Sequence, residues 1–231
     1  GILDSLWLLV TKKRMQVLNM TKKTDVLIVG TGAAGLFCAL HFPKETNVLM
    51  ITKNDVDKSD SFLAQGGMCM LPNEEDYDAY FEDTMRAGHY ENDKDSVEVM
   101  IRSSQDIAKE LIEYGVDFNR NDSGELAFTR EGGHSRPRIL FHEDVTGKEI
   151  TSTLLENARQ RDNITIVEHT AMLDIIADNN RCYGIVVQNT DGTVELIQAK
   201  YTVLACGGLG GLYQHLSLIH ISEPTRLALI S

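Results

Sequence analysis

The first part of the chain alternates apolar runs with one stretch of helical character. Residues 25–30 (DVLIVG) and 47–52 (NVLMIT) are almost continuously apolar, as strands buried on both faces of a sheet are. The residues between them, 33–42, predict a helix that Pro43 stops. This succession indicates a βαβ unit, whose connection is expected to be right-handed.

Helical spacing dominates the middle of the chain. Helices are expected at residues 77–87, 95–114 and from 146 to about 160. Asp95 and Glu98 form an Asp-x-x-Glu capping pattern at the start of the second helix, and Gly115 is placed to end it. Thr146 and Glu149 repeat the capping pattern at the start of the third helix.

From residue 164 onward the apolar residues follow the shorter period of strands. Five strands are expected, at residues 164–168, 171–177, 182–188, 194–198 and 201–205. Asp191-Gly192 is a hairpin turn signal between the third and fourth of them. The expected fold class is therefore α/β: a Rossmann-like domain with a parallel sheet plus an antiparallel β-meander.

The composition excludes several classes of partner. The 231 residues include 34 acids and 22 bases, and a net charge of -12 does not suit nucleic acid, which needs a basic footprint. Most of the excess, 16 acids against 5 bases, lies between residues 73 and 125 and is interpreted as solvated helix faces. The four cysteines form no Cys-x-x-Cys pair, so neither a metal site nor a disulfide framework is expected, and the protein is expected to be cytoplasmic. A membrane-spanning helix needs about 20 consecutive apolar residues, and no apolar run in the sequence approaches this length, so no membrane partner is expected.

The two ends of the sequence differ from the rest. Residues 1–20 are expected to be a non-native or disordered extension, with a native amphipathic extension as the alternative. Residues 21–216 are expected to form an incomplete domain. The final residues, 217–231 (SLIHISEPTRLALIS), are interpreted as a non-native tail, with a native divergent tail as the alternative.

A glycine-rich motif, GTGAAG, lies where the first strand meets the first helix. Gly30 allows the tight turn, Gly32 allows a pyrophosphate to approach the backbone, and Gly35 allows close packing of helix and strand. The helix N-terminus adds N–H groups and the positive end of a dipole. A lone GxGxxG is a weak signal, but its strand–turn–helix context predicts a dinucleotide site. Thr52 and Lys53 stand where NAD-binding proteins have an acid, which departs from the NAD pattern.

Three further segments carry candidate chemistry. Residues 59–67 (SDSFLAQGG) combine hydroxyls, an amide and paired glycines that can serve a flavin or pyrophosphate, although an ordinary loop is the alternative. Residues 202–208 (TVLACGG) are a strand ending in small residues that can pass under a cofactor, or a plain strand and turn. Residues 129–138 (TREGGHSRPR) gather three arginines, a histidine and a carboxylate, which suits an anionic ligand or a solvated loop.

The motifs GTGAAG, SFLAQGG, EDTMRAG, TREGGHS and LACGG, in this order, resemble one flavoprotein family over about residues 25–213. It is the family of succinate dehydrogenases, fumarate reductases and L-aspartate oxidases, and the resemblance is greatest to the L-aspartate oxidase branch. The resemblance implies FAD as cofactor and an FAD-binding domain whose capping domain is absent from this chain.

The same resemblance implies a set of cofactor contacts. Those of the FAD pyrophosphate would be Gly30, Thr31, Gly32, Ala33, Ala34 and Gly35. Those of the adenosine half would be Lys53, Ala171 and Met172. The flavin would run along Asp60, Ser61, Phe62, Leu63, Ala64, Gln65, Gly66 and Gly67, with Ala205 and Gly207 also at the cofactor.

Two places in the sequence discriminate within the family. Members with covalent flavin carry a histidine where this chain has Asp60, so non-covalent FAD is implied. The substrate loop reads EGGHS at residues 131–135, the form found in L-aspartate oxidases. A carboxylate there can recognise the ammonium that distinguishes aspartate from succinate. The implied catalytic residues are Glu131, His134 and Ser135.

The implied function is FAD-dependent oxidation of L-aspartate to iminoaspartate, which quinolinate synthase uses in de novo NAD biosynthesis. The family completes its active site with arginines and histidines from segments beyond this chain, so the fragment itself is expected to be inactive. The alternatives are a soluble fumarate reductase or succinate dehydrogenase-like flavoprotein, and an FAD-binding fragment without activity. A NAD(P)H-dependent disulfide reductase is disfavoured because Cys-x-x-Cys and a second GxGxxG are lacking.

Overall fold

A computed structural model describes residues 21–208, so the expectations for residues 1–20 and 217–231 lie outside the described part. The described residues divide into two compact units. The sheet unit comprises residues 21–59 and 155–206, and the helical unit comprises residues 60–154 with residues 207 and 208.

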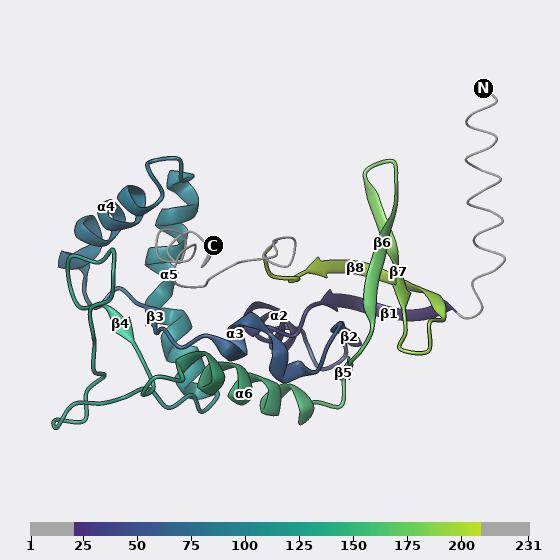
Figure 1. Cartoon of the computed structure of the whole chain (residues 1–231), viewed down its shortest axis with the longest axis horizontal. Helices are drawn as coiled ribbons and strands as arrows, with labels where there is room; N and C mark the ends of the chain where they lie inside the picture. Colours follow the sequence, from purple (N-terminus) through teal and green to yellow (C-terminus); the bar gives the residue numbers. More distant parts are fainter. Residues whose placement is uncertain (1–20, 209–231) are drawn as a thin grey trace. The chain divides into compact units, whose positions relative to one another are not determined.

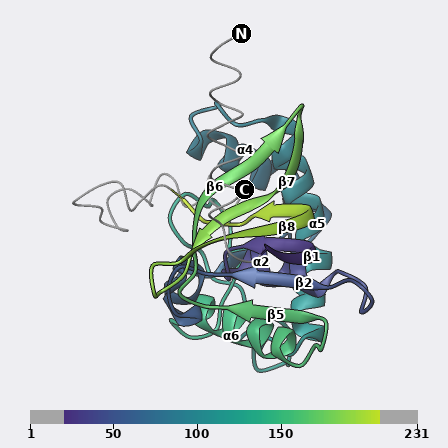
Figure 2. The same cartoon turned by 90° about the vertical axis from the view of Figure 1, so that its right-hand side faces the viewer.

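The sheet unit is built on a six-stranded sheet with the strand order β5-β2-β1-β8-β7-β6 (Figure 1, Figure 2). Its strands are β1 (Thr21–Val29), β2 (Val48–Ile51), β5 (Ile164–Val167), β6 (Ala171–Asp178), β7 (Arg181–Gln188) and β8 (Val194–Leu204). The neighbours among β5, β2, β1 and β8 pair in parallel, whereas β8 with β7 and β7 with β6 pair antiparallel. The expected α/β class, with a parallel sheet and an antiparallel meander, is confirmed.

Two strands are longer than the apolar pattern predicts. β1 begins at Thr21 rather than at residue 25, because residues 21–24 pair with residues 196–199 of β8. The strands expected at 194–198 and 201–205 are one strand. β8 pairs with β7 over residues 194–198 and with β1 from residue 196 to residue 204, so backbone hydrogen bonding continues through the polar residues between them.

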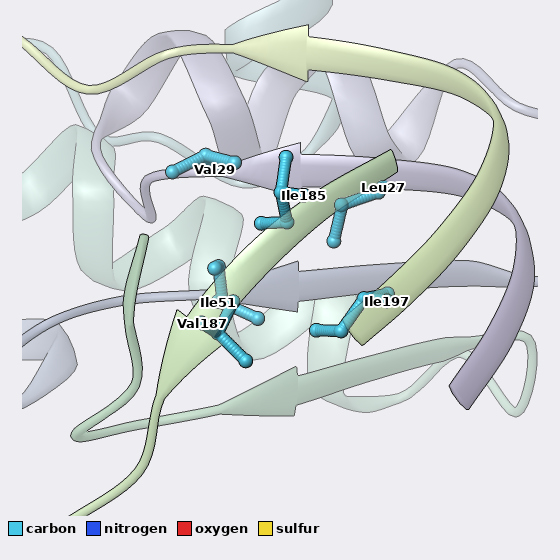
Figure 3. Close-up of a cluster of buried hydrophobic side chains, with 6 residues drawn as sticks. All are labelled: Leu27, Val29, Ile51, Ile185, Val187 and Ile197. Carbon is cyan, nitrogen blue, oxygen red and sulfur yellow. The ribbon is translucent and has the colours of Figure 1, made fainter. Parts of the chain in front are cut away.

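A hydrophobic core joins the parallel strands to the meander (Figure 3). Its buried members are Leu27, Val29, Ile51, Ile185, Val187 and Ile197, each at most 8% exposed. In Figure 3 the β7 side chains Ile185 and Val187 lie against those of β1 and β2, so the meander covers one face of the parallel sheet. The alternate β1 residues Val26 and Ile28 are buried as well, which explains why this strand is continuously apolar.

One α-helix links the first two strands of the sheet unit. α2 (Ala33–Leu40) ends two residues before the expected position and buries its side chains at Leu36, Ala39 and Leu40. A short 3-10 helix, η1 (Val56–Lys58), follows β2.

The helical unit carries α4 and α5 and a small sheet. Its elements are α3 (Asp60–Leu63), β3 (Met68–Cys69), η2 (Glu74–Asp76), α4 (Tyr77–Ala87), α5 (Lys94–Glu113), β4 (Ile139–Leu140) and the start of α6 (Thr146–Arg159). β3 and β4 pair antiparallel. A second apolar core contains Leu71, Tyr80, Met85, Val97 and Ile101. Within residues 21–208, none of the helices has the length and apolar character needed to cross a membrane.

The ends of α5 partly follow the sequence pattern. Its N-cap is Asp93, whose carboxylate accepts a hydrogen bond from Ser96 N at 2.8 Å, so the cap expected at Asp95 and Glu98 is wrong by two residues. Gly115 ends the helix as expected, with a φ of +104° and the two backbone hydrogen bonds of a Schellman motif across it.

The capping pattern at α6 marks the helix start without forming a capping box. Thr146 Oγ1 accepts a hydrogen bond from His142 N at 3.0 Å. Glu149 Oε1 accepts one from Asp117 N, also at 3.0 Å. Both side chains therefore tie the start of α6 to neighbouring loops instead of bonding to each other's backbone.

Candidate functional site

The glycine-rich turn lies between the carboxyl ends of three strands. Gly30 N donates to Ile51 O at 2.9 Å, and Ala205 N donates to Val29 O at 2.8 Å. Gly30 has a φ of +114°, and a Cβ on it would lie 2.0 Å from the Ala205 carbonyl oxygen. A Cβ on Gly35 would lie 2.2 Å from Gly30 O, so the helix also approaches the turn closely. Side chains are excluded at both positions.

The start of α2 fits an anionic group of a cofactor. Leu36 N donates to Gly32 O at 3.0 Å, so the amides of the three preceding residues lie outside the helical ladder. Gly32 is the N-cap and supplies no side-chain bond. Thr31 is 2% exposed, and among the described residues its hydroxyl has no hydrogen-bond partner. Free amides, the positive end of the helix dipole and an unpartnered hydroxyl suit the pyrophosphate of FAD.

The expected adenosine contacts come together at the ends of β2 and the start of β6. Lys53 follows β2 and is exposed. Thr170 N donates to Thr52 O at 2.9 Å, which joins the segment after β2 to the residue before Ala171. Ala171 and Met172 are the first residues of β6 and are partly exposed. The structure thus brings together two segments that lie more than 100 residues apart, 171 − 53 = 118.

The expected flavin segment, residues 60–67, is held by two contacts within the helical unit. Gly147 N, in the first turn of α6, donates to Ala64 O at 3.0 Å. A Cβ on Gly147 would lie 2.2 Å from Ser61 O, so no larger residue fits there without moving the segment. Gly67 N donates to Glu131 Oε1 at 3.1 Å, which ties the flavin segment to the expected substrate loop.

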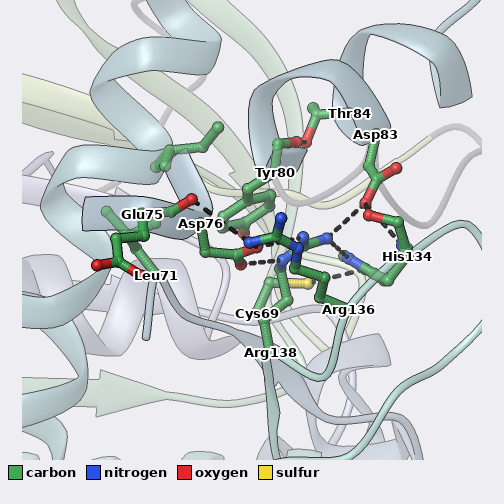
Figure 4. Close-up of polar contacts among 12 residues, drawn as sticks. Cys69, Leu71, Glu75, Asp76, Tyr80, Asp83, Thr84, His134, Arg136 and Arg138 are labelled. Atoms are coloured by element: carbon green, nitrogen blue, oxygen red, sulfur yellow. Dashed lines mark hydrogen bonds and ion pairs between the residues drawn. The ribbon is translucent and has the colours of Figure 1, made fainter. Parts of the chain in front are cut away.

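A buried polar cluster around Arg138 holds the rest of that loop (Figure 4). Arg138 is fully buried; its Nε and Nη2 donate to Asp76 at 2.7 and 3.0 Å, and Nη1 donates to Asp83 at 2.7 Å. Asp76 and Asp83 are 4% and 2% exposed, so the interpretation of the acidic segment as solvated faces is wrong for these two residues. Because two carboxylates neutralise Arg138, its charge is not open to an anionic ligand.

Asp83 also fixes Ser135. The amide and hydroxyl of Ser135 donate to Asp83 Oδ2 at 2.7 and 2.6 Å, and Arg86 Nη2 donates to Oδ1 at 2.6 Å. Burial raises the pKa of Asp83, but the hydrogen bonds from Ser135 and Arg138 outweigh it and lower the pKa to about 2. The proton of the Ser135 hydroxyl is therefore engaged by an ionised carboxylate.

The cluster also contains a cysteine–histidine pair. His134 is 8% exposed; its Nδ1 lies 3.0 Å from Arg138 Nη1, and its Nε2 lies 3.3 Å from Cys69 Sγ. Burial lowers the pKa of His134, and the charge of Arg138 lowers it further. Burial raises the pKa of Cys69 to about 11, so this thiol is protonated and is not an activated nucleophile. The Arg138 guanidinium also lies 4.9 Å from the centre of the Tyr80 ring.

The other two arginines of the loop remain near water. Arg136 is exposed and lies 3.4 Å from Asp76 Oδ1, and Arg130 is exposed. Any attraction for an anionic ligand therefore comes from Arg130 and Arg136. Of the implied catalytic residues, Glu131 holds the flavin segment, while His134 and Ser135 belong to the Arg138 cluster.

Sequence reasoning missed the partners of Arg138, although a signal was present. Asp76, Tyr80 and Asp83 are spaced i, i+4 and i+7 at α4, which places them on one helix face. Tyr80 belongs to the apolar core, so that face is buried. Acids on a buried face require a cationic partner, and this requirement points to a buried arginine.

Comparisons with known proteins find curated relatives and solved structures that are similar to this chain. The L-aspartate oxidase of Clostridium perfringens (strain 13 / Type A) is 43% identical over 195 residues, which are 84% of this chain and 44% of the relative. That of Clostridium acetobutylicum is 39% identical over 85% of this chain and 45% of the relative. The chain therefore spans less than half the length of the curated relatives it matches. Among solved structures, E. coli quinol fumarate reductase has a TM-score of 0.80 at 28% identity, over 85% of this chain and 34% of that chain.

These similarities confirm the resemblance that the five motifs indicated. The family model described as "FAD binding domain" matches residues 25–226, which include the glycine-rich turn, the flavin segment and the substrate loop. The chain belongs to this FAD-binding family.

Proposed function

We propose that the chain is the FAD-binding part of an L-aspartate oxidase, which oxidises L-aspartate to iminoaspartate with non-covalently bound FAD. The observation that carries the proposal is the position of Glu131. One of its carboxylate oxygens accepts from Gly67 N at 3.1 Å, so the acid is fixed beside the expected flavin segment. Among the described residues the other oxygen has no hydrogen-bond partner. A fixed carboxylate with a free oxygen suits the ammonium of aspartate.

Different residues of the chain would bind different parts of the cofactor and the substrate. Bound FAD would supply the hydride acceptor. The glycine-rich turn and the start of α2 would hold the pyrophosphate, and Lys53 with Ala171 and Met172 would lie at the adenosine half. Glu131 would orient the ammonium of the substrate, while the exposed Arg130 attracts its carboxylates. Iminoaspartate would pass to quinolinate synthase, and a cytoplasmic location fits the four free cysteines.

The test is a charge-removing substitution in a complete enzyme. Residues 21–208 are joined to the remaining part of the Clostridium perfringens relative, and Glu131→Gln is introduced. Glutamine keeps a carbonyl oxygen that can accept from Gly67 N, so the substitution removes the charge and preserves the contact. A charge-assisted hydrogen bond is worth about 1.5–3 kcal/mol, so the Kd for aspartate should rise by roughly one to two decades.

Ligands without an ammonium provide the comparison. Succinate and fumarate should bind Glu131→Gln as tightly as before, or more tightly, because like-charge repulsion is relieved. The matched control is Glu113→Gln, an exposed acid at the end of α5, which should leave both affinities unchanged. Equal weakening of aspartate and succinate binding would mean that Glu131 has a structural role only, and the proposal would lose its support.

A fumarate reductase-like activity is the second candidate, favoured by the TM-score of 0.80 to E. coli quinol fumarate reductase. The same chimera separates the two functions. Flavin reduction by aspartate supports the oxidase, whereas fumarate reduction without any response to aspartate supports the second candidate. If the chain belongs to a fumarate reductase-like enzyme, Glu131 would be expected to make no contact with the substrate.

A further inference from the structure

The contact between Arg138 and His134 determines where the imidazole carries its proton. A guanidinium has five N–H donors, no acceptor, and is always protonated. Arg138 Nη1 lies 3.0 Å from His134 Nδ1, and ion pairs to Asp76 and Asp83 fix the orientation of the guanidinium. His134 Nδ1 must therefore accept this hydrogen bond, which requires a lone pair and leaves no proton on that nitrogen.

The other ring nitrogen then carries the proton. A neutral imidazole without a proton on Nδ1 has one on Nε2. Nε2 lies 3.3 Å from Cys69 Sγ, so the neutral thiol accepts this hydrogen bond. A doubly protonated ring would place an N–H donor against an N–H donor, with two cations 3.0 Å apart.

The charged groups around the ring do not reverse this conclusion. The groups that face it are Arg138, Asp76, Asp83, Glu131, Cys69 and Tyr80. Burial and Arg138 disfavour the imidazolium, whereas the three carboxylates favour it, and the balance lowers the pKa of His134. Burial keeps the thiol of Cys69 and the phenol of Tyr80 protonated, because it raises the pKa of both.

We propose that Arg138 is a positioning residue that holds His134 as the neutral Nε2–H tautomer, so that the loop offers a hydrogen-bond donor and not a base. The inference that this donor binds a substrate carboxylate rests on the proposed function. The inference about the tautomer rests only on the contacts of His134 with Arg138 and Cys69. A carboxylate oxygen is a stronger acceptor than a thiol, so a dicarboxylate can replace Cys69 at Nε2. Asp83 assists because it fixes both Arg138 and the neighbouring Ser135.

The test is nitrogen-15 NMR of the full 231-residue chain with labelled histidine. Two-bond correlations from the ring protons distinguish a protonated from an unprotonated ring nitrogen, and His134→Gln identifies the His134 signals. We expect an unprotonated Nδ1 and a protonated Nε2 at neutral pH. The ring should still be mostly neutral at about pH 6.5, where an unperturbed histidine is half charged, because burial and Arg138 lower its pKa. A protonated Nδ1 at neutral pH, alone or with Nε2, would overturn the proposal.

Variants show which neighbour sets the tautomer. Cys69→Ala removes the acceptor at Nε2 and should leave Nδ1 unprotonated, as should Arg138→Lys, which still only donates. Arg138→Gln offers a carbonyl oxygen as well, and should lose the single-tautomer signature while the other six of the seven histidines keep their signals. If Arg138→Gln does not fold, the spectra of the wild type and of Cys69→Ala test the proposal. A proton that moves from Nε2 to Nδ1 of His134 in Cys69→Ala would refute the role of Arg138. An inactive chimera with the expected tautomer would refute the proposed function alone.

Discussion

Replacing Arg138 by methionine leaves two buried carboxylates without their shared cation. Asp76 and Asp83 are 4% and 2% exposed, and together they accept three hydrogen bonds of 2.7 to 3.0 Å from Arg138. Breaking a buried ion pair by removing one partner costs about 3–5 kcal/mol. Each acid keeps another partner, Ser135 for Asp83 and Arg136 for Asp76, so we expect about 3 kcal/mol, the lower end of this range.

The free energy of unfolding of Arg138→Met is measured by urea titration followed by circular dichroism, with two matched comparisons. Arg102→Met removes an arginine whose side chain is 47% exposed and which pairs with Glu98 at 3.1 Å, so it should cost less than about 1 kcal/mol. Arg138→Met combined with Asp76→Asn removes the charge of the acid whose remaining partner, Arg136, lies 3.4 Å away, and should be more stable than Arg138→Met alone. The reasoning is refuted if Arg138→Met costs no more than Arg102→Met.

The pH dependence of stability gives an independent check on the same cluster. The pKa of Asp83 is lowered from 3.8 to about 2 in the folded protein, so its contribution is present above pH 4 and is lost as the pH falls towards 2. The lost free energy is about 2 kcal/mol, from the roughly two-unit difference in pKa. In Arg138→Met this loss should be smaller, because one of the interactions that lowers the pKa is gone.

Four further predictions concern the cofactor and the substrate loop. Because Asp60 cannot form a histidyl–flavin bond, acid precipitation should give a colourless pellet and a yellow supernatant; a fluorescent yellow pellet would show covalent attachment. Gly147→Ala should weaken FAD binding about tenfold through the close contact with Ser61 O. Gly124→Ala has nothing within 4 Å of its Cβ and strains only the local backbone, whose φ is +81°, so it should bind FAD normally in the same fluorescence titration. The 231-residue chain should show no flavin reduction by aspartate, while the chimera should; turnover by the chain alone would contradict this. In the chimera, His134→Gln keeps an N–H donor and should retain kcat within about tenfold, whereas His134→Leu should lose about 10- to 100-fold; equal losses would indicate a base.

Much of the fold follows from apolar periodicity. The pattern placed β1, α2, β2 and the helix α4 within a few residues, because burial on one or two faces leaves a regular trace in the sequence. It divided β8 into two strands, since polar residues in the middle of a strand interrupt the pattern but not the backbone hydrogen bonds. The start of α5 was misplaced because several polar residues there can cap a helix, and only geometry selects Asp93.

The site was less accessible to sequence reasoning. Motifs located the glycine-rich turn and the loop that contains Glu131, because local chemistry requires glycine and charge at those places. Composition alone could not show that Arg138 is neutralised, since its partners lie 62 and 55 residues away in sequence. The sequence does not predict that Gly147 must be a glycine for the same reason, because this requirement comes from the carbonyl oxygen of Ser61 in a distant segment.

The pairing of β1 with β8 determines when the glycine-rich turn can be completed during synthesis. Gly30 lies against Ala205, so the glycine-rich turn lacks one wall until a further 205 − 30 = 175 residues have been made. At about 5–20 residues per second, this takes roughly 9–35 seconds. Throughout that interval β1 presents an unpaired, apolar strand edge, which is a site for aggregation. The proposed pyrophosphate site at this turn is therefore complete only after β8 has been synthesised.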